Sequence, residues 1–303
     1  MDSIHRTVLL NEAIEGLNLS GKSVVVDGTF GGGGHSLEIC KRFSKLNLGV
    51  KIIAIDQDAS AWQKAKDKFE GLNCSITFVN DNFRNLDQIL QKEGVQEVDG
   101  IILDLGLSSD QLENSGRGFS FMKDEPLLMT MKANPGEEDL TASDVVNTWS
   151  EENLAKIIFG YGEEKFARRI ARAIVEAREK KKIATTLELV KVISGAVPNV
   201  YRKGRLHFAT RTFQGIRIAV NDELGALTAG LKNGFNVLKK EGRMSVISFH
   251  SLEDRIVKKF YKEKEKEEEA KLINKKVILA SVEEIKSNGR SRSAKLRILE
   301  KIK

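Results

Sequence analysis

Short apolar runs that alternate with helical segments fill the first hundred residues and constrain the fold most strongly. Three of the runs lead directly into an aspartate: residues 24–27, 51–56 and 98–104. A fourth run covers 75–79, and helical periodicity covers 36–43, 59–69 and 87–92. Strands and helices that alternate at this spacing predict βαβ units and a parallel sheet. Ligands are then expected at the carboxyl ends of the strands.

The alternation stops after about residue 107 and returns in strand patterns at 243–249 and 295–299. The intervening chain is rich in Gly, Ser, Asp and Asn up to about residue 140. Helical patterns then cover 150–182, with a break at 160–162, followed by 186–194 and 212–239. We therefore predict an α/β protein with a Rossmann-like sheet at residues 1–109 and 213–303. A mostly helical insertion at 110–212 interrupts it.

Composition narrows the class of protein. The 303 residues carry a formal net charge of +6, which suits an anionic partner such as nucleic acid. Cys40 and Cys74 lack metal-ligand spacing, so we expect reduced core thiols, no metal site and a cytoplasmic protein. No secretory signal and no membrane-spanning run is expected. The Lys- and Glu-rich stretch at 262–276 predicts a solvated helix or a flexible connector.

A glycine-rich loop at residues 27–36 lies between the first predicted strand and the first helix. Glycines let the backbone approach a ligand closely, and Asp56, about 20 residues further on, can accept hydrogen bonds from both ribose hydroxyls. The dinucleotide pattern GxGxxG fits imperfectly, because Ser36 or Leu37 falls at its third glycine. No GxxxxGK[ST] phosphate loop is present. A nicotinamide dehydrogenase is therefore a distant alternative.

Several strings together resemble one enzyme family. They span residues 5–10, 27–36, 99–106, 117–121, 161–164, 166–171, 209–214 and 248–255. This set is similar to the bacterial 16S ribosomal RNA cytosine-N4 methyltransferases, the MraW or RsmH family. The loop resembles the D-x-G-x-G-x-G pattern of class I methyltransferases, with Thr29 in place of the first glycine.

The resemblance implies a class I methyltransferase sheet split by a helical substrate-recognition domain. It also implies the donor S-adenosyl-L-methionine, and 16S ribosomal RNA or the small ribosomal subunit as partner. The resemblance and the size of the chain permit a monomer or a homodimer. The implied cofactor contacts are Gly33, Gly34, His35, Asp56, Phe83, Asp104 and Gln111.

The implied reaction needs a cytosine N4 held in line with the methyl–sulfur bond. Hydrogen-bond acceptors around N4 can localise its lone pair and take up the released proton. Asp104 is the first candidate, followed by Ser108 and Ser109, although Asp104 could instead bind only the cofactor. His250 is a further candidate, but helix capping by Ser251 with Asp254 would explain its string equally well.

Basic residues form three groups around the predicted nucleotide site, as expected for an RNA backbone. They are Lys165, Arg168, Arg169 and Arg172; Lys203, Arg205, His207, Arg211 and Arg217; and Arg290, Arg292 and Arg297. Leu128 and Thr130 stand where the family usually has Asp and Arg. A cofactor-binding protein without turnover, or a methyltransferase acting on DNA or protein, is therefore an alternative.

Overall fold

The computed structural model describes residues 7–303, so His5 and Arg6 of the first family-like string lie outside it. The chain divides into two compact units. Unit 1 comprises Met1–Gly106 with Leu224–Lys303, and unit 2 comprises Leu107–Glu223. Each unit has buried hydrophobic clusters of its own.

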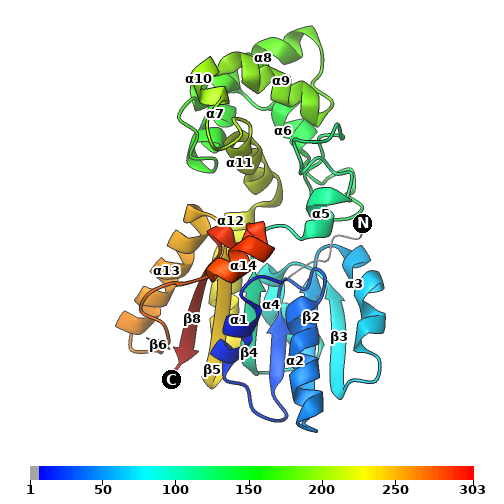
Figure 1. Cartoon of the computed structure of the whole chain (residues 1–303), viewed down its shortest axis with the longest axis vertical. Helices are drawn as coiled ribbons and strands as arrows, with labels where there is room; N and C mark the ends of the chain where they lie inside the picture. Colours follow the sequence, from blue (N-terminus) through cyan, green and yellow to red (C-terminus); the bar gives the residue numbers. More distant parts are fainter. Residues whose placement is uncertain (1–6) are drawn as a thin grey trace. The chain divides into compact units, whose positions relative to one another are not determined.

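Unit 1 is built on one sheet with the strand order β3-β2-β1-β4-β5-β8-β6, and β7 pairs with β8 (Figure 1). Its strands are β1 (Val24–Asp27), β2 (Val50–Asp56), β3 (Cys74–Asn80), β4 (Val98–Asp104), β5 (Leu238–Ser248), β6 (Ala270–Leu272), β7 (Ile278–Leu279) and β8 (Lys295–Lys301). The first five pair in parallel, and β8 runs antiparallel to β5. The predicted Rossmann-like α/β sheet is confirmed.

Alternating residues of the parallel strands pack into separate clusters on the two faces of the sheet, which is why these strands are mostly apolar. Val26 and Ile53 face one cluster, which is completed by α4 (Leu86–Lys92), α12 (Glu223–Val237) and α13 (Ser251–Lys266). Val25 and Ile52 face the other, which is completed by α1 (Leu10–Leu17), α2 (Gly34–Lys45) and α3 (Ala59–Ala65). The 3-10 turns η1 (Lys66–Phe69) and η2 (Phe83–Asn85) follow α3 and β3.

The stretch at 262–276 begins as a helix, which is one of the two structures that its charge pattern predicted, and then forms a strand. Helix α13 continues to Lys266, and Ala270–Leu272 then pairs with β8 as strand β6. Ala270 is buried, which explains why the segment returns to the sheet. Helix α14 (Val282–Ser287) and turn η3 (Gly289–Ser293) then lead into β8.

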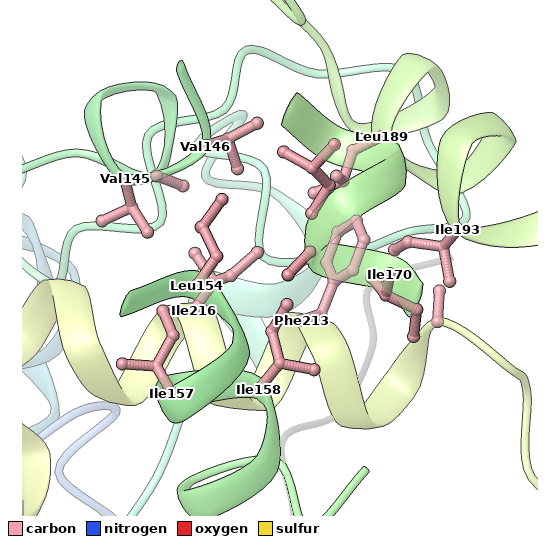
Figure 2. Packing of buried hydrophobic residues seen from close by; sticks show 14 of the residues in the cluster. Val145, Val146, Leu154, Ile157, Ile158, Ile170, Leu189, Ile193, Phe213 and Ile216 are labelled. Carbon is pink, nitrogen blue, oxygen red and sulfur yellow. The ribbon is translucent and has the colours of Figure 1, made fainter. Parts of the chain in front are cut away.

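Unit 2 is helical, as expected for the insertion. Its helices are α5 (Ser109–Glu113), α6 (Ala142–Thr148), α7 (Glu151–Gly160), α8 (Ala167–Lys180), α9 (Thr186–Ala196), α10 (Asn199–Arg202) and α11 (Thr210–Asn221). Figure 2 shows side chains from five of them converging on one apolar core, including Leu154, Ile170 and Phe213.

The boundaries of the insertion lie outside those placed from the sequence. Phe213 and Ile216 of α11 are buried in the core of unit 2, so a boundary at 212/213 would cut through that helix. The structure instead passes between units at Gly106/Leu107 and at Glu223/Leu224.

Cys40 and Cys74 are not the reduced thiols that were expected. The structure joins them in a disulfide between α2 and the first residue of β3, with a Cα–Cα distance of 5.6 Å. The sequence could not indicate this pairing, because the two residues are 34 positions apart and meet only when α2 packs beside β3. Across residues 7–303, we find no helix with the length and apolar character needed to cross a membrane.

Candidate active site

The candidate site lies where the strand order of unit 1 reverses. The chain runs outward from β1 through β2 to β3, then returns to place β4 on the other side of β1. Loops that leave adjacent strands at such a point diverge, which creates the usual ligand site of open α/β sheets. The strands β1 and β4 end there at Asp27 and Asp104.

The glycine-rich loop takes a conformation that suits glycine. Gly31 and Gly33 have φ values of 50° and 73°, and the N–H of Gly33 donates to the Phe30 carbonyl (2.7 Å). Helix α2 begins at Gly34 without a side-chain cap on its first amides. A Cβ at Gly34 would lie 1.8 Å from Thr7 Oγ1, so packing within the protein also requires this glycine.

Asp56 is held beside this loop by backbone hydrogen bonds. The N–H of Gly31 donates to Asp56 Oδ2 (2.6 Å), and the N–H of Asp58 donates to Oδ1 (2.8 Å). The carboxylate at the end of β2 is therefore oriented toward the loop that follows β1. A carboxylate oxygen can accept more than one hydrogen bond.

Thr29 and His35 bring the same loop to the end of β4. Thr29 Oγ1 accepts a hydrogen bond from the Asp104 N–H (2.6 Å), a contact that the glycine of the usual pattern could not make. His35 is buried, and its Nδ1 lies 3.9 Å from Asp104 Oδ2. The structure thus brings together the predicted residues His35 and Asp104.

Asp104 lies in an environment that disfavours its charge. Burial, and then the nearby acids Asp27 and Glu253, raise its pKa well above the usual range. Its Oδ1 is buried and has no hydrogen-bond partner among residues 7–303. A buried acceptor without a donor is costly, and a donor group on a ligand would satisfy it.

Asp27 is also buried and has two hydrogen-bond partners. Ser36 Oγ donates to its Oδ2 (2.6 Å), and the Thr29 N–H donates to its Oδ1 (3.3 Å). Burial outweighs these bonds and raises the pKa of Asp27 to about 6, and the Asp56 charge contributes in the same direction. The loop therefore has three carboxyl groups around it, two of them with raised pKa values.

Phe83 supports the loop from the side of α12. The residue opens η2 after Asn82, whose side chain caps the turn. A Cβ on Gly28 would lie 3.2 Å from Phe83 Cβ, and one on Gly230 would lie 2.4 Å from its ring. Phe83 is therefore in contact with the first turn of the loop, next to the other predicted residues of unit 1.

His250 caps α13 and is held by Glu253. Its side chain accepts from the Glu253 N–H (3.4 Å), and Glu253 Oε2 accepts from the amides of Phe249 (2.8 Å) and His250 (3.2 Å). The predicted cap by Ser251 with Asp254 is wrong by one residue, because Asp254 instead forms ion pairs with Arg297 and Lys295. Since β4 and β5 are adjacent and parallel, His250 follows the strand beside Asp104.

The remaining predicted residues belong to unit 2. Ser108 Oγ accepts from the Gln111 N–H (3.1 Å), and Gln111 Oε1 accepts from the Ser108 N–H (3.0 Å). This capping box starts α5, whose first residue is Ser109. The structure therefore assigns Ser108 and Gln111 a local structural contact within unit 2, whereas Asp104 belongs to unit 1.

Leu128 and Thr130 lie in a segment that other parts of unit 2 hold firmly. Arg117 is buried and donates through Nη1 to the carbonyls of Thr130 (3.2 Å) and Met131 (2.9 Å). Met129 between them has a φ of 52°. Thr130 is itself buried, whereas Leu128 is half-buried. A guanidinium group, that of Arg117, therefore lies beside the segment in which Leu128 and Thr130 replace the family's usual Asp and Arg.

Several of the basic residues predicted to bind RNA already form ion pairs or hydrogen bonds within the protein. Arg217 pairs with Glu223 at 2.8 Å, and Arg297 pairs with Asp254 at 2.7 Å. Arg211 donates to the Glu163 carbonyl (2.8 Å). These three residues stabilise the fold of their own units, which reduces the set of cations available to an external anion.

Sequence reasoning did not assign roles to Glu253, Thr29 or Asp27. Glu253 orders the turn after β5, Thr29 fixes Asp104, and Asp27 adds a buried carboxyl group. The available signal was positional, because Asp27 directly ends a strand as Asp56 and Asp104 do.

The sheet order, with a glycine-rich loop after β1 and an acid ending β2, defines a protein of the Rossmann-like class I methyltransferase type. The model of the MraW methylase family matches residues 2–302, and the chain belongs to this family. It is an S-adenosylmethionine-dependent methyltransferase.

Similar curated proteins agree over the full length. The chain is 49% identical to a protein of Clostridium botulinum (strain Kyoto / Type A2) named ribosomal RNA small subunit methyltransferase H, with 100% of each chain covered. It is 46% identical to the protein of the same name from Clostridioides difficile, again over 100% of each. Among solved structures, an rRNA methylase from Streptococcus thermophilus overlays with a TM-score of 0.46 at 12% identity, covering 99% of each chain.

Proposed function

We propose that the chain transfers a methyl group from S-adenosylmethionine to N4 of a cytidine in the 16S ribosomal RNA of the small subunit. The observation that carries the proposal is the site at the end of β4, where the half-buried Asp104 lies 3.9 Å from the buried His35 of the glycine-rich loop. The full-length similarity to proteins named ribosomal RNA small subunit methyltransferase H supports the choice of substrate.

The residues of unit 1 fit the donor. The orphaned Asp104 Oδ1 requires a hydrogen-bond donor, which an α-amino group would provide. The uncapped first amides of α2 suit a carboxylate, and Asp56 suits ribose hydroxyls. We assign cofactor binding in unit 1 to Gly33, Gly34, His35, Asp56, Phe83 and Asp104, and the family resemblance adds Gln111. When bound, S-adenosylmethionine supplies an electrophilic methyl group on a positively charged sulfur.

The protein must then hold the acceptor amine and dispose of its proton. The acceptors beside the end of β4 are Asp104, and Ser108 and Ser109 just beyond it in the chain. A carboxylate or hydroxyl oxygen that accepts from N4–H draws the nitrogen lone pair out of conjugation with the ring. Because Asp104 can be a cofactor ligand as well as this acceptor, its two roles need separate measurements.

His250 is the second candidate for contact with the acceptor. Its Nε2 lies 3.2 Å from Glu253 Oε1, so the imidazole has a fixed position at the start of α13. We propose that Glu253 positions this imidazole and that His250 contacts the base or receives its proton. The base must be single-stranded or extruded to reach such a site, and we assign its recognition to unit 2.

The experiment is transfer of radiolabel from S-adenosylmethionine to small ribosomal subunits that lack the modification, with nucleoside analysis of the product. Label in N4-methylated cytidine is the expected result. Label in another nucleoside, or only in DNA or protein, would refute the assignment. Asp104→Asn keeps the side-chain volume, so cofactor affinity measured beside the transfer rate separates its two roles. Asp87→Asn, at an exposed residue of α4, is the matched control.

Leu128 and Thr130 support a second reading, a donor-binding protein without turnover. Donor binding with no labelled nucleoside on free RNA or on assembled subunits would favour it. Leu128→Asp with Thr130→Arg would then be expected to restore transfer. We further propose a cytoplasmic location. We also propose that the chain is a monomer or a homodimer, and sedimentation of the purified chain would distinguish these two states.

A further inference from the structure

The start of α8 carries a group of cations without acidic partners. Lys165, Arg168 and Arg169 are exposed, and none forms an ion pair with any residue in the described chain from 7 to 303. By contrast, Arg172, one turn further along, lies 3.5 Å from Glu151. Lys165, Arg168 and Arg169 form what we call the α8 cation group.

The position of these charges in the helix is unfavourable by itself. The amino end of a helix carries a partial positive charge and favours acidic residues. The first turn of α8 contains no acid, and its N-cap residue, Phe166, provides no side-chain cap. Three cations at this end repel both one another and the helix dipole, so an external anion would relieve the repulsion.

Two aromatic rings hold part of the group in place. The rings of Phe166 and Tyr201 meet edge to face with their centroids 4.9 Å apart. Lys165 Nζ lies 5.1 Å from both ring centroids, and the Arg169 guanidinium lies 5.8 Å from that of Phe166. Cation–π contacts orient a cation without neutralising it. The ammonium and guanidinium groups are thus positioned in advance while their charge stays available.

A buried carboxylate fixes the aromatic pair. Tyr201 Oη donates to Glu164 Oε2 (2.5 Å), and the Phe166 N–H donates to Glu164 Oε1 (2.8 Å). Glu164 is fully buried, so its two oxygens accept hydrogen bonds from Phe166 and Tyr201 and do not pair with the exposed cations. Burial and the contact with Glu164 raise the pKa of Tyr201 to about 12, so the hydroxyl remains a donor near neutral pH.

We propose that the α8 cation group, set on the Phe166–Tyr201 pair, is a binding site for phosphate groups of a single-stranded RNA backbone. Exposed Lys203 and Arg205, which follow α10 directly, extend the positive charge. This proposal rests on the proposed RNA substrate, which it deepens by placing a backbone contact on unit 2. It needs no base recognition, because phosphate contacts carry no sequence information.

The test is the salt dependence of RNA binding by the full chain without S-adenosylmethionine. A short fluorescein-labelled single-stranded oligoribonucleotide is titrated at several KCl concentrations and followed by anisotropy. Lys165→Gln with Arg169→Gln should reduce the slope of log K against log salt by about 1.4, since each contact on a single strand contributes about 0.7. At about 0.1 M salt this corresponds to a loss of affinity of about 25-fold.

The matched control is Lys180→Gln with Lys191→Gln, which removes the same charge from exposed lysines of α8 and α9. It should leave the slope unchanged. Phe166→Leu keeps every charge but removes the ring, and should weaken binding by about 2- to 5-fold.

An equal effect of both double variants would overturn the proposal, because general charge would then explain binding. Unchanged RNA affinity in the Lys165/Arg169 variant would also overturn it, and would leave another macromolecule as the partner of this surface. Far-ultraviolet circular dichroism checks that each variant is folded. Because binding is measured without the donor, loss of transfer alone would count against the proposed function and not against this site.

Discussion

The raised pKa of Asp27 makes the stability of unit 1 depend on pH in a direction opposite to that of most aspartates. Asp27 is 2% exposed, and burial raises the pKa of its carboxyl group from 3.8 to about 6. Between these values the folded chain keeps a proton that the unfolded chain loses. Stability therefore falls as the pH rises through this window. A shift of about two units corresponds to about 3 kcal/mol in total.

Asp27→Asn removes the titration while keeping the size of the side chain. We expect the free energy of unfolding of the variant, relative to the wild type, to increase by about 2 kcal/mol from about pH 4.5 to about pH 7.5. The sign follows because only the wild type must bury a charge at the upper end. Loss of one acceptor for Ser36 or Thr29 adds an offset that does not depend on pH in this window.

Urea denaturation across this pH range measures the difference. The chain contains two tryptophans, Trp62 in unit 1 and Trp149 in unit 2, so a Trp149→Phe background makes fluorescence report on unit 1. Asp67→Asn, at an exposed residue of η1, is the control and should follow the wild-type profile. If the Asp27→Asn curve also runs parallel to the wild type, the carboxyl group is not held protonated by burial, and the reasoning fails.

Three further predictions concern other contacts. Reduction of the Cys40–Cys74 disulfide by dithiothreitol should lower the free energy of unfolding of the oxidised chain by about 4 kcal/mol, because the disulfide closes a long loop. Dithiothreitol should have no such effect on Cys40→Ser. Asn221→Ala should destabilise unit 2 by about 2 kcal/mol, since its side chain donates to the Met129 carbonyl and accepts from the Met131 amide. Glu253→Ala should cost about 1 to 2 kcal/mol in unit 1 through loss of the cap of α13, and should slow methyl transfer more than it weakens donor binding.

Each of these has an outcome that contradicts it. If thiol titration without reductant finds two free cysteines, the prediction for the disulfide is refuted. For Asn221→Ala, the readout is urea unfolding followed by Trp149 alone, and an unchanged midpoint would show that the 129–131 segment is held by other contacts. For Glu253→Ala, equal losses of donor affinity and transfer rate would mean that His250 has no separate part in the reaction.

The parallel sheet could be predicted because its strands carry their own signal. Runs such as 98–104 are mostly apolar and buried and end in an acid, so both the strand and its functional end are local features. The short strands β6 and β7 lacked such a signal. β6 follows a run of Lys and Glu, and only pairing with β8 makes Ala270–Leu272 a strand.

The candidate site was predictable only in part for the same reason. The glycine loop and Asp56 follow spacing rules, whereas the hydrogen bond between Thr29 and Asp104 joins residues 75 positions apart. The sequence allows two caps for α13, His250 with Glu253 or Ser251 with Asp254, one residue apart. The register is decided by Asp254, which forms an ion pair with Arg297 of β8, 43 positions further along the chain.

The position of unit 2 within the chain has a consequence for synthesis on the ribosome. Strand β4 is complete at Asp104, but its partner β5 begins only at Leu238. At about 5 to 20 residues per second, the edge of β4 waits roughly 7 to 27 s for that partner. During this interval the nascent sheet has an open, apolar edge of the kind that recruits other strands. Unit 2, as one continuous segment with its own core, can fold completely in the meantime. The first half of the sheet is thus the part of the newborn chain with the greatest need for protection by chaperones.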